Sequence, residues 1–160
     1  MCPPQALQAD SDAAGGSTRG APGCGIVFRD AWTVLKWPSY VNSDKKCRCG
    51  GKFRHKLTFL ELCGHLLHLT LFTNEILDTP VRTNIDNEGT VCGASKGRSL
   101  RCQLTDCLIS AINYVAVALG CKAYVIKVRR CSTVQAEAAD SLSNKYVERT
   151  IPGQYVFRDV

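Results

Sequence analysis

The chain has 160 residues, with 20 lysines and arginines against 14 aspartates and glutamates, which gives a formal net charge of +6. Hydrophobic residues make up 45% of the sequence and charged residues 21%, a balance that suits a single folded domain and excludes a disordered chain. The longest nearly apolar run, residues 107–121, is shorter than the roughly 20 residues of a membrane-spanning helix.

The first predicted elements are three strands. Polar and apolar residues alternate over residues 5–12 and predict a short strand, and the glycines of residues 15–25 predict a turn after it. Two further apolar stretches, residues 24–29 and 32–37, flank a tight connection and predict a hairpin that ends at Pro38.

A loop, a helix and a strand are predicted next. Residues 42–56 are polar and basic and contain two adjacent glycines, which is typical of a loop. Leucines and a glycine at spacings of four, three and four predict a helix over residues 57–72, with Thr58 as its cap and Glu61 as the capping-box partner in its first turn. Residues 80–86 alternate and predict a strand that ends in a turn.

The last part of the chain predicts two helices around a strand. Apolar side chains at spacings of four, four, three and four predict a helix over residues 100–119, and Gly120 supplies its stop. Residues 123–128 predict a strand, and the alanine-rich residues 132–145 predict a helix. The resulting order of elements is typical of an α/β protein with a mixed sheet packed by helices.

Four acidic residues stand in four different elements. Asp12 follows the first strand, Glu61 lies in the first helix, Asp86 ends the fourth strand and Asp140 lies in the last helix. We expect strand ends and flanking helices to bring these side chains into one cleft. Clustered carboxylates repel one another unless a divalent cation neutralises them, and oxygen ligands suit Mg²⁺ or Mn²⁺. The sequence therefore predicts a site for metal and phosphate.

Several short motifs follow one another along residues 6–146: Ser11-Asp12-Ala13-Ala14-Gly15-Gly16, Gly23-Cys24-Gly25-Ile26-Val27-Phe28, Trp32, Trp37-Pro38, Thr58-Phe59-Leu60-Glu61-Leu62, Asp86-Asn87, Lys96-Gly97-Arg98-Ser99 and Ala138-Ala139-Asp140-Ser141-Leu142-Ser143. This ordered set resembles the ribonuclease H-like domain of DIRS-like and related retrotransposon polyproteins. The resemblance implies a ribonuclease H-like, five-stranded mixed sheet flanked by helices, with the first strand central and the next two antiparallel. It places the domain at residues 5–146 and leaves residues 147–160 as a C-terminal tail or the start of a missing segment.

The resemblance also implies a chemistry for the four acids. In the resembled enzymes, two Mg²⁺ or Mn²⁺ ions support hydrolysis of the RNA strand of an RNA–DNA hybrid, which leaves a 3′-hydroxyl and a 5′-phosphate. Carried over residue by residue, Asp12 is the bridging ligand, Glu61 and Asp86 each fix one metal, and Asp140 is a ligand of the metal that activates water. The implied partners are an RNA–DNA hybrid and a reverse transcriptase domain in a longer polyprotein.

Basic residues form two groups that suit a nucleic-acid backbone. Clustered cations bind phosphates by releasing counterions, without reading the sequence of bases. The first group, just before the helix that carries Glu61, is Lys45, Lys46, Arg48, Lys52, Arg54 and Lys56. The second group, before the long helix, is Lys96, Arg98 and Arg101. Such a charge run is also typical of an ordinary solvated surface.

Two other functions stay open at this level. The first is a remnant that folds and binds nucleic acid without cutting it, because Asn144 stands after Ser143 where the resembled family usually has arginine. The second is an interaction module with a zinc clip through Cys47 and Cys49, although one residue separates these thiols instead of the two to four typical of structural zinc. Glu61 can equally be a capping residue and no ligand.

The N-terminus has neither a basic start nor the apolar stretch of about 7 to 15 residues that marks a secretory signal. We therefore expect an intracellular protein, in the cytoplasm or the nucleus. In that setting the 10 cysteines are expected to be reduced thiols, several of them packed as small hydrophobic side chains.

Overall fold

The structure is a computed structural model that describes residues 2–14, 23–38, 53–99, 102–130, 132–145 and 156–157, with the backbone alone for 53–56, 144–145 and 156–157. Its elements in chain order are β1 (Leu7–Ala13), β2 (Gly23–Phe28), β3 (Ala31–Lys36), α1 (Phe53–Leu71), α2 (Thr73–Ile76), β4 (Val81–Ile85), α3 (Glu88–Lys96), α4 (Gln103–Ala118), β5 (Ala123–Lys127), α5 (Val134–Lys145) and β6 (Val156–Phe157).

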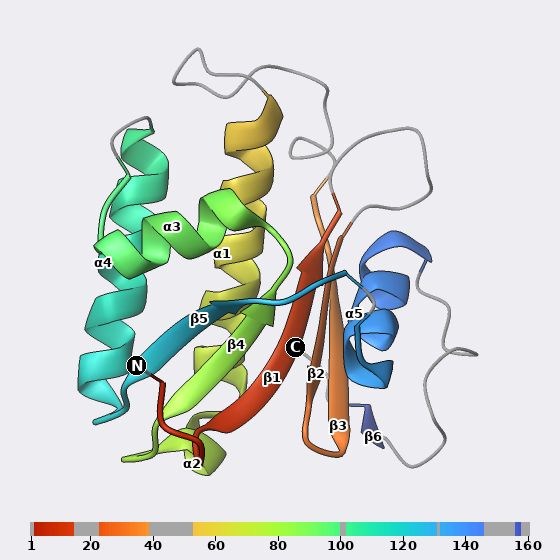
Figure 1. Ribbon diagram of the computed structural model, residues 1–160, viewed down its shortest axis with the longest axis horizontal. Coiled ribbons are helices and arrows are strands. Elements are labelled where there is room, and N and C mark those ends of the chain that lie inside the picture. Colours follow the sequence, from red (N-terminus) through yellow and green to blue (C-terminus); the bar gives the residue numbers. More distant parts are fainter. Residues whose placement is uncertain are drawn as a thin grey trace.

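The strands form one mixed sheet in the order β5-β4-β1-β2-β3-β6 (Figure 1). The chain runs β1, β2 and β3 as an antiparallel meander, whereas β4 is parallel to β1 and β5 is parallel to β4. The predicted five-stranded sheet with a central first strand is confirmed. The two-residue strand β6 extends it by pairing in parallel with the outer edge of β3.

Alternation along β2 divides the core into two parts. Ile26 and Phe28 point into the larger cluster, whereas Val27 joins a smaller cluster with Ala139 and Leu142 of α5. Successive residues of a strand face opposite sides of a sheet, so a strand that is buried along its whole length needs helices on both sides.

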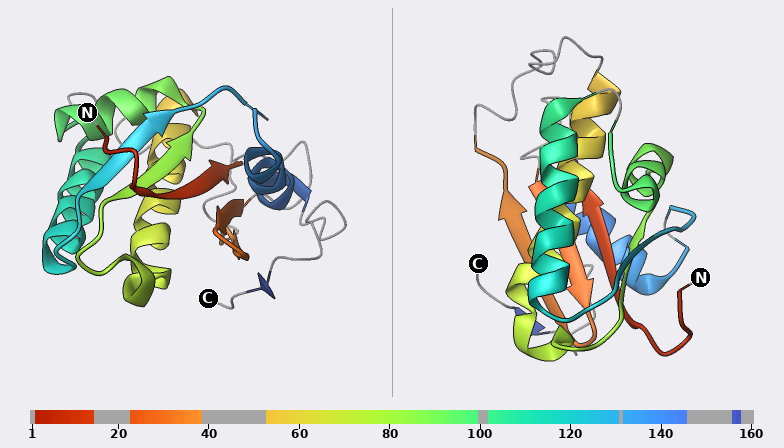
Figure 2. Two further views of the ribbon diagram at one scale, coloured as in Figure 1. Left: turned by 60° about the horizontal axis from the view of Figure 1, so that its bottom comes forward. Right: turned by 90° about the vertical axis from the view of Figure 1, so that its left-hand side faces the viewer.

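The helices occupy these two faces. α1 and α4 pack together over the larger cluster, and α5 lies alone against the opposite face (Figure 2). The long helix α4 turns Ile109, Ile112 and Ala116 inwards. Of the predicted apolar repeat only Ile112 is fully buried, and Leu104, its first member, is 49% exposed, so the inward face is rotated from the predicted one. None of the described helices combines the length and the apolar character that crossing a bilayer demands.

Two local predictions are wrong. α1 begins at Phe53, inside the predicted loop, so Thr58 lies within the helix and Glu61 is not in its first turn. The predicted turn after β4 is in fact the start of α3, where the side chain of Asn87 accepts a hydrogen bond of 3.1 Å from the backbone of Thr90. Two glycines within its nine residues give α3 a low helix propensity, and tertiary contacts with β4, β5 and α1 compensate for this.

Candidate metal centre

The register of β1 and β4 places two carboxylates side by side. Asp10 and Asn84 are the last paired residues of these parallel strands, and the Asn84 amide donates to Asp10 over 3.0 Å. Asp12 and Asp86 each follow two residues later, so the two-residue period of a strand aims them to the same side as Asp10 and Asn84. Beyond the last pair the strands separate, which opens the sheet between Asp12 and Asp86.

Glu61 reaches this opening from α1, which lies on the face of the sheet that carries the larger core cluster. Its side chain is only 1% exposed. Gly64, one turn further along α1, allows the helix to approach the strands closely: a Cβ atom at Gly64 would lie 2.8 Å from Cys24 Sγ and would also collide with Ser11 Oγ. The missing side chain of Gly64 therefore sets the depth at which Glu61 reaches the two aspartates.

The helix α5 supplies the remaining polar groups from the opposite face. Ser143 is fully buried and hydrogen-bonds the carboxylate of Asp12, and its Oγ lies 3.0 Å from the backbone carbonyl of Asp140. Close packing over Gly25 of β2 makes this possible, since a Cβ there would lie 2.5 Å from Leu142 Cβ. Ser143 thereby holds Asp12 in place, a role that the sequence reasoning missed.

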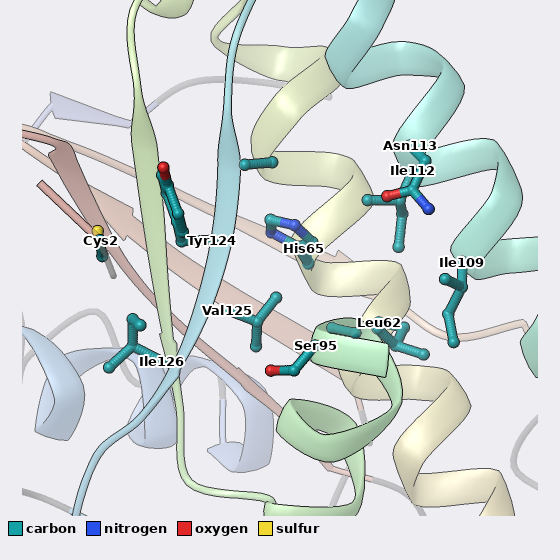
Figure 3. Close-up of a pocket in the computed structure, with 12 residues that line it drawn as sticks. Cys2, Leu62, His65, Ser95, Ile109, Ile112, Asn113, Tyr124, Val125 and Ile126 are labelled. Atoms are coloured by element: carbon teal, nitrogen blue, oxygen red, sulfur yellow. The ribbon is translucent and has the colours of Figure 1, made fainter. Parts of the chain in front are cut away.

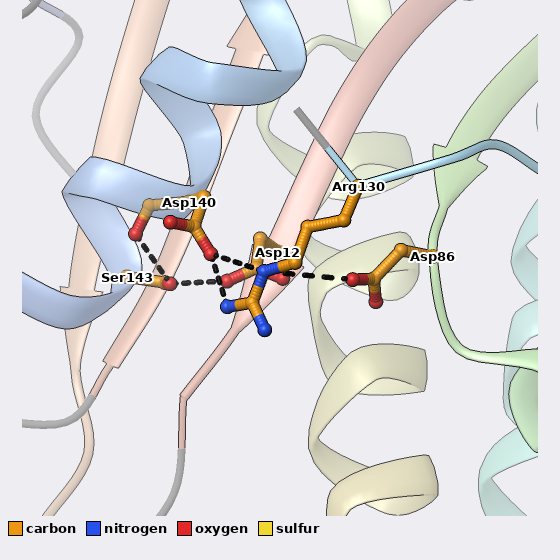
Figure 4. A network of polar contacts seen from close by, with 5 residues as sticks. All are labelled: Asp12, Asp86, Arg130, Asp140 and Ser143. Carbon is orange, nitrogen blue, oxygen red and sulfur yellow. Dashed lines mark hydrogen bonds and ion pairs between the residues drawn. The ribbon is translucent and has the colours of Figure 1, made fainter. Parts of the chain in front are cut away.

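The structure brings three of the four acids into one cluster. Asp12, Glu61 and Asp86 each offer a carboxylate oxygen, and these three oxygens all lie within 4.8 Å of one another. Asp140 stands beside this group but is paired with Arg130, whose Nε donates to Asp140 Oδ1 over 3.0 Å (Figure 4). We call Asp12, Glu61 and Asp86 the carboxylate cluster.

Burial makes the carboxylate cluster electrostatically unfavourable without a cation. The pKa of Asp12 is raised to about 6, mainly by burial and further by the negative charges of Asp140 and Asp86. The hydrogen bond from Ser143 partly opposes this rise. Burial also raises the pKa of Glu61 well above its usual range, and the charges of Asp12 and Asp86 add to this effect. A bound divalent cation would reverse both effects by stabilising the ionised carboxylates.

One atom shows that the carboxylate cluster fits such a cation. Glu61 Oε2 is buried and has no hydrogen-bond partner in the part of the chain that the structure describes, although a buried polar atom normally has one. Leaving a charged oxygen unpaired is costly, and a metal ion would satisfy it. Three carboxylates, one from β1, one from α1 and one from the bend after β4, are the hard oxygen donors that Mg²⁺ or Mn²⁺ requires.

The structure describes only some of the residues that are predicted to contact nucleic acid. Lys96 ends α3 and Arg98 follows it, and both side chains are exposed. Arg54 and Lys56 belong to the first turns of α1, where only the backbone is described. The remaining predicted contacts lie outside the described residues: Lys45, Lys46, Arg48, Lys52 and Arg101.

The zinc alternative gains nothing from the described histidines. His65 and His68 are buried in the core, where their Nδ1 atoms lie 2.7 and 2.9 Å from the hydroxyl of Thr83. Burial lowers the pKa of His65 to about 4 and that of His68 to about 3, so both rings are neutral core side chains. Cys47 and Cys49 lie outside the described residues.

A larger cavity lies elsewhere in the molecule. It measures about 440 Å³ and is bordered by Leu62 and His65 of α1, Ile109 of α4 and Val125 of β5 (Figure 3). Its described lining contains no carboxylate.

Replacing Gly64 with alanine is expected to lower the melting temperature of the protein and to weaken Mn²⁺ binding. The added methyl group would push α1 away from the sheet and withdraw Glu61 from the cluster. Gly93 of α3 is the matched control, because a Cβ there meets only Ile109 Cδ1, at 3.5 Å. Gly93→Ala is expected to stabilise the protein by about 0.5–1 kcal/mol through helix propensity. Equal melting temperatures for both variants would contradict this account of the helix packing.

Solved structures with similar folds are ribonucleases H. The structure superposes on RNase H1 from the halophilic archaeon Halobacterium salinarum NRC-1 with a TM-score of 0.57 and 13% sequence identity, covering 89% of this chain and 98% of that one. For LC11-RNase H1, isolated from compost by a metagenomic approach, the TM-score is 0.54 at 14% identity, with 89% and 99% of the two chains covered. The same enzyme in complex with an RNA/DNA hybrid gives a TM-score of 0.52 at 12% identity over 89% and 99% of the chains.

No protein-family model matches the chain, and no curated protein matches it either. At such low identities, similarity of structure establishes the fold alone. The chain therefore has the ribonuclease H fold, and its activity has to be argued from the carboxylate cluster.

Proposed function

We propose that this chain is a metal-dependent ribonuclease that hydrolyses the RNA strand of RNA–DNA hybrids. The observation that carries the proposal is the convergence of Asp12, Glu61 and Asp86, with a buried Glu61 oxygen that has no hydrogen-bond partner among the described residues. Such a cluster destabilises the metal-free fold, so a structural role alone does not account for it.

The proposed reaction is the hydrolysis of a phosphodiester. The oxygen of a water molecule forms a bond to phosphorus, the bond from phosphorus to the 3′ oxygen breaks, and that oxygen takes up a proton. Asp12, Glu61 and Asp86 would hold the divalent ion, and Asp140 would complete a second position next to it. Two ions there would neutralise charge on the phosphate as Lewis acids.

The protein's own residues orient the ligands. Ser143 fixes the Asp12 carboxylate through its hydrogen bond, and the packing of α1 holds Glu61 away from bulk water. Ligands on a central strand and two packed helices are held more rigidly than ligands on loops. The packing therefore holds Asp12 and Glu61 in position before metal or substrate binds.

The substrate class is proposed from charge and from fold similarity. The exposed Lys96 and Arg98 and the basic run at residues 45–56 would contact backbone phosphates. One of the similar structures, LC11-RNase H1, is in complex with an RNA/DNA hybrid. Recognition through the shape of the hybrid and the 2′-hydroxyl suits an enzyme that reads no bases. The retroelement motifs support an origin as the ribonuclease H portion of a retroelement polyprotein, next to a reverse transcriptase.

Hydrolysis of an end-labelled RNA–DNA hybrid in MgCl₂ or MnCl₂ tests the proposal. The wild-type chain is expected to cut the RNA strand and leave 3′-hydroxyl and 5′-phosphate ends, and Asp86→Asn is expected to lower the rate by more than about 100-fold, because losing a ligand costs more than losing a group that only orients one. Asp30→Asn, in the exposed turn between β2 and β3, is the matched control and keeps full activity.

The outcomes separate the competing functions. Binding of the hybrid without hydrolysis would identify a catalytically inactive remnant. Equal rates for wild type and Asp86→Asn would show that the carboxylate cluster is not the catalytic site. Zinc retained in stoichiometric amount through dialysis would favour the zinc-clipped module instead.

A further inference from the structure

A single arginine stands between the carboxylate cluster and the fourth acid. Arg130 follows β5 in a short connection to α5, and its guanidinium lies between Asp86 and Asp140 (Figure 4). Its Nε and Nη2 both donate to Asp140 Oδ1, and its Nε lies 3.8 Å from Asp86 Oδ2. Arg130 thus pairs one member of the cluster with the acid that the cluster leaves out.

The charge balance gives this contact its significance. Four carboxyl side chains meet at this edge of the sheet, and among the ion pairs found in the described ranges only those of Arg130 involve them. The positive charge of Arg130 also lowers the pKa of Asp12 and of Glu61, against the larger effects that raise them. In the metal-free protein Arg130 therefore does part of what a metal ion would do.

The exposed position of the Arg130 side chain allows it to move away from Asp86 and Asp140. Its side chain is 60% exposed, whereas those of Asp86 and Asp140 are 28% and 25% exposed. An exposed ion pair of a long side chain is weak, since water screens the charges and the side chain loses conformational freedom. A divalent cation carries twice the charge and would be held by the same Asp140 carboxylate that now accepts both guanidinium bonds.

We propose that Arg130 is a built-in competitor for the second metal position. It binds Asp140 while only the carboxylate cluster holds an ion, and it must leave Asp140 before a second ion can bind there. The two positions consequently differ in affinity, with a tight one at Asp12, Glu61 and Asp86 and a weak one at Asp140. This inference depends on the proposed function only for the presence of a divalent ion at the cluster.

Mn²⁺ titration of the metal-free protein, followed by electron paramagnetic resonance of the free ion, tests this directly. The wild type is expected to bind one ion tightly and a second weakly, and Arg130→Gln is expected to tighten the second event by about tenfold. Lys122→Gln removes the same charge from an exposed position just before β5, at the other end of that strand from Arg130, and is expected to change the second event by less than about twofold. In Arg130→Gln combined with Asp140→Asn, the second event should be lost.

Some results would overturn the proposal. Equal effects of Arg130→Gln and Lys122→Gln would show that only overall charge matters, and weaker Mn²⁺ binding in Arg130→Gln would show that the arginine supports the metal. Thermal melting confirms that each variant is folded, and Arg130→Lys, which keeps the charge but has no fork of donors, should fall between wild type and Arg130→Gln. Absence of hybrid hydrolysis by the wild type would end the proposed function and leave these binding results unaffected.

Discussion

Replacing Asp12 with asparagine is expected to stabilise the metal-free protein at pH 8 while abolishing hydrolysis. The pKa of Asp12 in the native state is raised from 3.8 to about 6, so its contribution to stability is lost as the pH rises through 6. The full shift corresponds to about 3 kcal/mol, and at this partly exposed position we expect about 1–2 kcal/mol. For a chain of this length the melting temperature should rise by about 2–8 °C.

Added metal should reverse the order of stability of wild type and Asp12→Asn. MgCl₂ or MnCl₂ stabilises only a protein that binds the ion, and the gain grows with the logarithm of the metal concentration. Wild type should therefore become more stable as metal is added, whereas Asp12→Asn should stay unchanged and should hydrolyse hybrids more than about 100-fold more slowly, because a ligand is lost. Asp30→Asn is the control for a change of surface charge. A metal-free Asp12→Asn protein that melts below wild type would contradict the claim that the carboxylate cluster is electrostatically unfavourable without a cation.

Replacing His68 with phenylalanine is expected to make the protein more resistant to acid. The native pKa of His68 is lowered from 6.5 to about 3, so between these values the unfolded chain binds a proton that the native state does not. Stability contributed by the neutral ring is complete above about pH 6.5 and is lost as the pH falls. Between pH 7.5 and pH 5 this amounts to about 2 kcal/mol for the one ring.

The comparison uses urea unfolding of wild type and His68→Phe at several pH values. The slope of stability against pH counts protons, so a uniform loss from imperfect packing against Phe28 and Phe72 does not affect it. His65, whose pKa is lowered to about 4 by burial, is present in both proteins, so both keep the part of the pH dependence that this ring contributes. Asp12 takes up a proton in the native state near pH 6, and this opposes the loss of stability at low pH equally in both proteins. Identical slopes would contradict the assignment of His68 as a buried neutral ring.

Patterns with a clear period made the fold predictable. The alternation of residues 80–86 and the four-and-three spacing before Gly120 predict a strand and a helix, which the structure places at β4 and α4. Both signals come from the burial of one face, which a sequence records directly. The start of α1 escaped prediction because it continues a polar, basic run. The whole of α3 escaped because glycines and polar residues dominate it, and contacts with β4, β5 and α1 decide the outcome there.

The candidate site was predictable in part for a related reason. Asp12 and Asp86 lie where parallel strands end and separate, so knowledge of the strand order is enough to bring them together. The approach of Glu61 depends on how closely α1 packs on the sheet, which Gly64 controls. Arg130 was missed because a single arginine after a strand carries no periodic or spacing signal, and only the fold brings it to Asp140.

Diffraction from crystals grown with Mn²⁺, recorded at a wavelength where manganese scatters anomalously, tests the metal centre most directly. An anomalous peak about 2.1 Å from carboxylate oxygens of Asp12, Glu61 and Asp86 is the predicted result. A well-folded protein with no manganese among these three carboxylates at millimolar Mn²⁺ would contradict it.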